Sequence, residues 1–198
     1  KLNFGSSSYA FSTKMETKDI TNLSASASNG LSVSGNKLLD GDGNEFIMRG
    51  VNITHAWAKA YTEDSIKGAG ELGSNTVRVV LSDGTAENFG GKTTKTEVEN
   101  IISWSKESGQ ICVLELHDFT GLNDASYITT NAVNYWTEIK DILNANKDYV
   151  ILNIANEWFG KWDSSTTSEE KSIWKNAYVT AIKALRNAGI ENVIMVDA

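Results

Sequence analysis

Five short apolar segments recur along this chain at a nearly constant interval, and this feature limits the folds open to it more than any other. They are residues 46–53, 76–81, 111–116, 150–155 and 193–196, and roughly 37 residues separate the starts of successive segments. That interval fits one strand, one helix and the loops that join them. Because each segment is almost continuously apolar, we predict five strands of a sheet covered on both faces.

The stretches between these segments carry apolar residues at helical spacing. The clearest is the last one, where one face collects Trp174, Ala177, Tyr178, Ala181, Ile182 and Leu185. Residues 132–143 and 98–102 predict two more helices, and Thr94 with Glu97 forms a capping-box pattern before the latter. Strands that alternate with helices predict an α/β fold with parallel strands.

The choice within this fold class is between an open doubly wound sheet and a barrel. No glycine-rich dinucleotide or phosphate-binding motif follows any of the five segments, which disfavours the nucleotide-binding form of the open sheet. Polar side chains instead gather where several strands end, which is where a (β/α)8 barrel builds its active site. We therefore predict the N-terminal part of a (β/α)8 TIM barrel, covering about strands 1 to 5.

The chain divides into two regions by composition. Residues 1–29 are rich in Ser, Thr, Asn and Lys, which predicts a linker or the end of a preceding domain. Residues 30–198 form the predicted partial barrel domain. It begins with a short β-hairpin, because Gly35-Asn36 and residues 40–44 are both turn-forming. The second turn resembles the start of a calcium loop, but Glu45 stands where such a loop needs glycine.

Charge and cysteine content exclude several classes of function. The chain has 18 Lys and Arg against 25 Asp and Glu, a net charge of -7, so nucleic acid is not an expected partner. No apolar run is long enough to span a membrane. One cysteine and two histidines are too few for a structural zinc site, and we expect neither metal nor cofactor. Cys112, inside an apolar strand, is expected to be a buried inert thiol. The sequence predicts no particular oligomeric state.

Polar groups follow or end every predicted strand. In chain order they are Asn52, His55, Trp57, Arg78, Glu115, His117, Asp118, Asn156, Glu157 and Asp197. A carboxyl group flanked by an amide and an indole suits a general acid, because partial desolvation raises its pKa and the amide orients the substrate. Glu157, beside Asn156 and Trp158, is the candidate. The alternative is that this pair caps the next helix, but three large aromatics follow it, which favours contact with a sugar face.

Several spaced motifs resemble those of bacterial endo-β-1,4-mannanases of glycoside hydrolase family 5, subfamily 8. They are residues 153–162 (NIANEWFGKW), 49–57 (RGVNITHAW), 75–81 (NTVRVVL), 113–118 (VLELHD) and 131–136 (NAVNYW). The likeness runs from about Gly30 to Ala198. It implies a secreted enzyme that cuts internal bonds of β-mannan with retention of configuration, without metal or cofactor.

The resemblance also implies roles for individual residues. Glu157 would be the acid/base, Asn156 the partner of the sugar 2-hydroxyl, and Arg78 the cation beside the nucleophile. His117 would line the glycone subsites. The further substrate-binding candidates are Asn52, His55, Trp57, Trp158 and Trp162.

A retaining glycosidase needs a second carboxyl group, about 5 to 5.5 Å from the first. The resemblance places this nucleophile in strands six to eight, outside these residues, so we expect a truncated part of a longer enzyme. Asp118, Glu115 and Asp197 are possible substitutes in principle, although Glu115 is expected to fill the barrel interior.

Two other functions stay open at the level of sequence. A β-1,4-glucanase could use the same scaffold. A non-catalytic carbohydrate-binding or assembly fragment is also consistent, since half a barrel leaves its first and fifth strands with unpaired edges.

Overall fold

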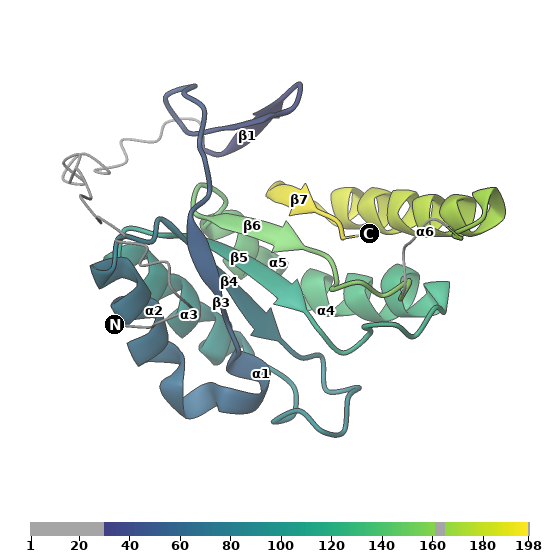
Figure 1. The fold of residues 1–198 in the computed structure, drawn as a ribbon, viewed down its shortest axis with the longest axis horizontal. Coiled ribbons are helices and arrows are strands. Elements are labelled where there is room, and N and C mark those ends of the chain that lie inside the picture. The colour runs from purple at the N-terminus through teal and green to yellow at the C-terminus, as the bar shows by residue number, and fades with distance from the viewer. Residues whose placement is uncertain (1–29, 161–164, 198) are drawn as a thin grey trace, which may run out of the picture.

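The computed structural model describes residues 30–160 and 165–197, so the predicted linker at 1–29 and Trp162 lie outside the described residues. Its centre is a five-stranded sheet in the order β3-β4-β5-β6-β7, with every neighbouring pair parallel. The strands are β3 (Gly50–Ile53), β4 (Thr76–Leu81), β5 (Ile111–Leu116), β6 (Val150–Asn153) and β7 (Val193–Met195). Strand order therefore follows chain order, as the predicted partial barrel requires (Figure 1).

Helical segments connect the strands. They are α1 (His55–Ala58), the short 3-10 helix η2 (Lys59–Tyr61), α2 (Thr62–Glu71), α3 (Lys95–Glu107), the π-helix η3 (Tyr127–Ala132), α4 (Val133–Glu138), α5 (Lys140–Ala145) and α6 (Ser168–Asn187). The predicted capping box at Thr94 and Glu97 is confirmed at the start of α3. The predicted helix over 132–143 is divided, because Ile139 has φ -107° and ψ 14°, outside α-helical geometry.

The two faces of the sheet differ in chemistry. Paired positions on neighbouring strands share a face, and Val77, Cys112 and Val150 belong to the buried core that packs on the helices. Arg78, the residue after Val77, points to the opposite, inner face. Glu115 and Asn153 share that face, so it carries charged and amide side chains. The helices α2, α3 and α5 lie behind the sheet in Figure 1, on that apolar face. The inner face also holds buried side chains, among them Val113, Glu115 and Ile151, so the two faces differ in polarity rather than in burial alone.

The first predicted strand is shorter than its apolar run, because the side chain of Asn75 replaces part of the ladder. Asn75 Oδ1 accepts a hydrogen bond from the Arg49 amide (2.7 Å), and its Nδ2 donates to the Ile47 carbonyl (2.9 Å). Regular pairing begins at Gly50, where a Cβ would lie 1.7 Å from the carbonyl oxygen of Thr76. Among the described strands, β3 and β7 each have one neighbour, so the expectation of two free edges is confirmed.

The predicted hairpin is present as β1 (Ser32–Ser34) and β2 (Lys37–Leu39), which pair antiparallel. The following turn is closed by Asp40, whose Oδ1 accepts from the amides of Asp42 (3.0 Å) and Asn44 (2.9 Å). The hairpin projects from the end of the sheet where the strands begin, whereas α1 lies at the opposite end (Figure 1).

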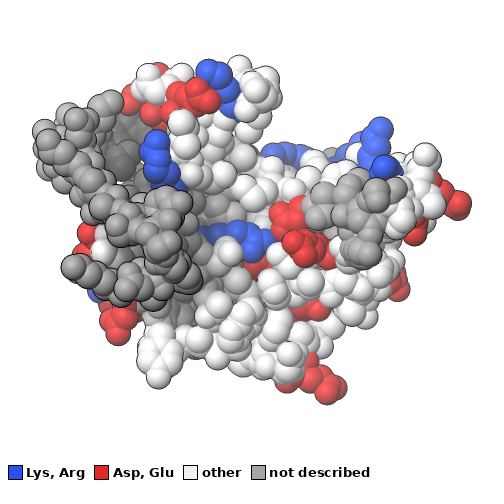
Figure 2. Space-filling view, in the orientation of Figure 1, with Lys and Arg blue, Asp and Glu red and all other residues white. Residues whose placement is uncertain are grey.

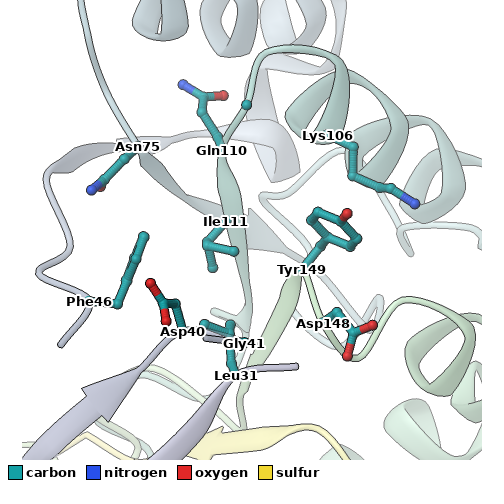
Figure 3. Close-up of a pocket in the computed structure, with 11 residues that line it drawn as sticks. Leu31, Asp40, Gly41, Phe46, Asn75, Lys106, Gln110, Ile111, Asp148 and Tyr149 are labelled. Atoms are coloured by element: carbon teal, nitrogen blue, oxygen red, sulfur yellow. The ribbon is translucent and has the colours of Figure 1, made fainter. Parts of the chain in front are cut away.

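A cavity of about 180 Å³ lies between this hairpin and the starts of the central strands (Figure 3). Its walls include Phe46 from the hairpin side and Ile111 and Tyr149 from β5 and the loop before β6. Because a parallel sheet of this kind places its chemistry at the carboxyl ends of strands, this cavity is not the candidate site. Within the described part of the chain, no helix has the length and hydropathy to cross a membrane.

Candidate active site

Arg78 on β4 contacts residues at or after the ends of β6 and β7 on the inner face of the sheet. Its Nε and Nη2 donate to Asn153 Oδ1 (3.1 and 2.8 Å) at the end of β6. The same Nη2 donates to Asn156 Oδ1 (3.0 Å) and Asp197 Oδ2 (2.9 Å). Figure 2 shows basic and acidic atoms side by side near the middle of this face. The guanidinium group therefore fixes β4, the end of β6 and the segments after β6 and β7 in one arrangement.

The amide of Asn156 is held at both ends. Its Oδ1 accepts from Arg78, and its Nδ2 donates to Thr120 Oγ1 (3.0 Å). The backbone amide of Asn156 also donates to the Leu116 carbonyl (2.8 Å) at the end of β5. An amide nitrogen has two hydrogens, and within the described residues only one of those of Asn156 is engaged, so the other can serve a ligand.

Glu157 is exposed at the carboxyl end of the sheet and has an unusual backbone conformation. Its φ is 32°, a left-handed value that costs a residue with a Cβ on the order of 1–3 kcal/mol. Two hydrogen bonds of 3.0 Å hold its carbonyl, from the amides of Gly121 and Gly160. Such strain at the exit of a strand points to a functional position.

The alternative that Asn156 and Glu157 cap the next helix is wrong. That helix is α6, and its N-cap is Thr167, whose side chain accepts from the Glu170 amide while the Glu170 side chain accepts from the Thr167 amide. The capping box lies ten residues beyond Glu157, so the side chain of Glu157 is not needed to cap the helix.

Glu115 and His117 lie two residues apart near the end of β5 and share the inner face. His117 Nδ1 is 3.0 Å from Glu115 Oε1, and Arg78 Nη1 is 3.4 Å from Glu115 Oε2. The carboxyl group is fully buried, which confirms that Glu115 fills the interior. Burial raises the pKa of Glu115, while His117 and Arg78 act in the opposite direction.

Three aromatic rings form a cluster beside this group. The ring of Trp57 lies 5.0 Å from that of Phe89 and 5.5 Å from that of His117, between ring centroids. Trp57 is 47% exposed, so one part of the indole faces solvent. The Gly90 amide donates to the Ala56 carbonyl (2.7 Å) and fastens the loop of Phe89 to α1. Sequence reasoning missed Phe89, although an aromatic between Asn88 and two glycines was a usable signal.

Two of the predicted substrate-binding residues lie in the interior instead. His55 is 3% exposed, with Nδ1 2.8 Å from Thr62 Oγ1, and burial lowers its pKa. Trp158 is 1% exposed and packs edge-on against Phe159 and Tyr178. Both were expected to face a sugar. In both cases the backbone directs the ring toward the core, where burial of the ring is favourable.

Asn52 and Arg78 occupy paired positions on β3 and β4. They line one hollow of about 320 Å³ on the inner face, together with Val113 and Met195. The structure thus places Asn52 next to Arg78 on the neighbouring strand. Sequence reasoning also missed Asn153, whose signal was an amide within an apolar strand.

The three carboxyl groups considered as a second catalytic group are already engaged. Asp118 Oδ1 accepts from Ser82 Oγ (2.8 Å) and the Ala86 amide (3.0 Å), while its Oδ2 accepts from the Asp83 amide (3.0 Å). Asp197 and Glu115 face Arg78. Asp118 therefore orders the loop after β4, whereas Asp197 and Glu115 hold the Arg78 side chain on the inner face. Among residues 30–160 and 165–197, no group of three or more His, Cys, Asp or Glu is arranged to hold a metal ion.

Comparison with known proteins places these features in a family context. The family model described as Cellulase (glycosyl hydrolase family 5) matches residues 39–198. A mannan endo-1,4-beta-mannosidase of Salipaludibacillus agaradhaerens is 41% identical over 85% of this chain, and one of Cellvibrio japonicus (strain Ueda107) is 44% identical over 87%. These matches cover 51% and 38% of the two relatives, so the chain spans about half or less of their length.

Solved structures agree with this comparison. The catalytic domain of a mannanase from Streptomyces sp. SirexAA-E has a TM-score of 0.74 and 39% identity, over 85% of this chain and 51% of that chain. A β-mannanase from Streptomyces thermolilacinus, determined with mannohexaose, has a TM-score of 0.74 and 38% identity, over 85% of this chain and 53% of its own.

Proposed function

Because this chain belongs to glycosyl hydrolase family 5, we propose that the protein carrying it is an endo-acting glycosidase that cuts internal β-1,4 bonds of mannan. The observation that carries the proposal is the exposed Glu157, in left-handed conformation beside an Asn156 that Arg78 holds. The identity with mannan endo-1,4-beta-mannosidases supports mannan as the substrate.

Glu157 is the proposed acid/base of a double displacement. A carboxylate nucleophile from residues outside this chain attacks the anomeric carbon, the glycosidic bond breaks, and Glu157 gives its proton to the leaving oxygen. Glu157 then takes a proton from water as that water displaces the nucleophile. Both steps balance in protons and electrons without metal or organic cofactor.

Asn156 and Arg78 orient the sugar in this proposal. The free N–H of Asn156 donates to the 2-hydroxyl, and Arg78 keeps the amide from rotating through its hydrogen bond to Oδ1. Trp57 offers the exposed part of its indole to a pyranose face, and the ring of His117 lies beside it, with 5.5 Å between the ring centroids.

The test is Glu157→Gln in the complete protein. We expect kcat on mannan to fall by about 10²- to 10⁴-fold, because general acid catalysis is lost. For a mannoside with a good leaving group, such as dinitrophenolate, the rate of the first step should fall less, because that leaving group needs no proton. Glu99→Gln, an exposed residue of α3, is the matched control and should leave kcat unchanged.

Unaltered hydrolysis by the Glu157→Gln variant would remove the acid/base assignment. A non-catalytic carbohydrate-binding fragment would show no hydrolysis in the unmodified protein and equal affinity for mannan in both variants. The two outcomes therefore separate the enzyme from a binding module.

A β-1,4-glucanase is the second candidate function, favoured by one relative. A protein of Caldicellulosiruptor saccharolyticus named Beta-mannanase/endoglucanase A is 41% identical over 152 residues. Reducing-sugar release from pure mannan, glucomannan and carboxymethylcellulose discriminates the two. Cleavage of carboxymethylcellulose alone would overturn the choice of mannan.

The proposal includes an extracellular site of action. Polymeric mannan is too large to enter the cell, so it must be cut outside before its fragments are taken up. Mannanase activity should therefore collect in the medium of the producing organism. Activity confined to washed, lysed cells would contradict secretion.

A further inference from the structure

The buried carboxyl group of Glu115 contacts both Arg78 and His117 on the inner face described above. Its Oε1 is 3.0 Å from Nδ1 of His117, and its Oε2 is 3.4 Å from Nη1 of Arg78. Glu115 is 0% exposed. Oε2 makes no hydrogen bond within the described residues, so the Arg78 cation is the group that faces this oxygen. Fully buried carboxylates are costly unless they are paired in this way.

This contact decides the tautomer of His117. The Arg78 cation beside Oε2 favours the ionised carboxylate against the effect of burial, and an ionised carboxylate has only acceptor sites, so His117 Nδ1 carries the proton that lies between the two groups. In the neutral ring Nε2 then has a free lone pair. The side chain of His117 is 26% exposed and its ring lies edge-on to that of Trp57, so the proposal takes this lone pair as the acceptor for a sugar hydroxyl.

The second oxygen of the Glu115 carboxyl group, Oε2, faces Arg78. Arg78 donates to Asn153, Asn156 and Asp197, and Glu115 faces its remaining nitrogen, Nη1. A single buried carboxyl group is thus placed between Arg78, which holds the Asn156 amide, and His117.

We propose that Glu115 is a positioning residue of the sugar site, which fixes His117 in the Nδ1–H tautomer and braces the guanidinium group that orients Asn156. The proposal rests on the glycosidase function proposed above. Glu115 touches no substrate in this scheme and acts through its two neighbours.

The decisive variant is Glu115→Gln, which keeps size and removes charge. Its amide oxygen should face Arg78, because the opposite orientation would place an N–H₂ group against the guanidinium. The amide nitrogen then donates to His117 Nδ1, and the proton of the ring must move to Nε2. Nitrogen-15 NMR of selectively labelled histidine in the complete protein reads this directly. We expect Nδ1–H in the unmodified protein and Nε2–H in the variant.

Activity gives the second readout. Loss of the acceptor at Nε2 should lower kcat/KM on mannan about 10- to 100-fold, whereas Glu99→Gln should have no effect. In a His117→Ala background, the same Glu115→Gln change should cost several-fold less, because one of its two routes is already lost. Equal cost in both backgrounds would contradict action through His117.

The NMR measurement stands apart from catalysis. An Nε2–H tautomer in the unmodified protein overturns the proposal, even where Glu115→Gln fails to fold. An unchanged tautomer in a folded Glu115→Gln variant overturns it as well. Failure of the unmodified protein to hydrolyse mannan or glucan would instead remove the proposed function, while the tautomer would still report on the Glu115 contact.

Discussion

Asn156 Oδ1 accepts a hydrogen bond of 3.0 Å from Nη2 of Arg78, although the two residues are 78 positions apart in the chain. Arg78 lies in the middle of β4 and Asn156 lies three residues past the end of β6. β5 separates the two strands, so the long arginine side chain reaches across the inner face. The relationship shows how a residue within one strand controls the amide beside the candidate acid.

Replacement of Arg78 should therefore be costly even by another cation. Arg78→Lys leaves one ammonium group where a planar fork serves several oxygens, and the buried Asn153 and Glu115 lose their contacts with the guanidinium group. We expect the free energy of unfolding to fall by about 3–5 kcal/mol in urea titrations of the complete protein. Arg49→Lys, at an exposed position, is the control. Equal free energies of unfolding for the two variants would contradict the conclusion that the Arg78 guanidinium holds the inner face together.

Trp57 and Trp158 should respond in opposite ways. Trp57 is 47% exposed, so Trp57→Ala should cost at most about 1 kcal/mol in unfolding free energy and raise KM for mannan several-fold. Trp158 is 1% exposed, so Trp158→Ala should cost about 3–5 kcal/mol. Urea unfolding and initial rates on mannan separate the two effects. A large stability loss at Trp57 would show that its ring serves packing.

Asp83 provides a pH-dependent test of the loop after β4. Burial raises the pKa of Asp83 above its ordinary value of 3.8, and the nearby Asp118 adds to this, against hydrogen bonds from Thr85. A raised pKa means that the folded state prefers the protonated acid, so this contribution to stability is complete below pH 3.8 and is lost as pH rises through the folded pKa.

Asp83→Asn should therefore increase the free energy of unfolding at pH 7. The gain should vanish below pH 3.8. Unfolding of both proteins across this range measures the difference. Glu87→Gln, an exposed acid of the same loop, should show no such trend. A gain for Asp83→Asn that is the same at all pH values would contradict the assignment.

Cys112 should be unreactive in the folded protein. Its side chain is 0% exposed, and burial raises the pKa of the thiol to about 12. Because the thiolate is the reacting form, iodoacetamide at pH 8 should leave the Cys112 peptide unmodified. The same peptide should be alkylated in urea, which mass spectrometry detects. Rapid alkylation without denaturant would show that this part of β5 opens readily.

The sequence determined the fold class and the approximate position of the site. Strand and helix periods are local, since side chains alternate every two residues in a strand and every 3.6 in a helix, so apolar spacing located β4, β5, β6 and most of α6. The capping box before α3 is also local and was predicted from Thr94 and Glu97. Polar residues at strand ends then predicted one shared edge, because the strands are parallel.

The direction of each side chain was decided only by the tertiary structure. His55 and Trp158 stand at strand exits as Trp57 and Glu157 do, yet the first two are buried and the last two are exposed. Nothing local distinguishes them, because the outcome depends on turns fixed by distant partners, such as the Gly121 amide on the Glu157 carbonyl. The Arg78 contacts likewise join residues from several strands. Hydrogen bonds and packing between residues far apart in sequence carry no periodic pattern, so only the folded chain defines them.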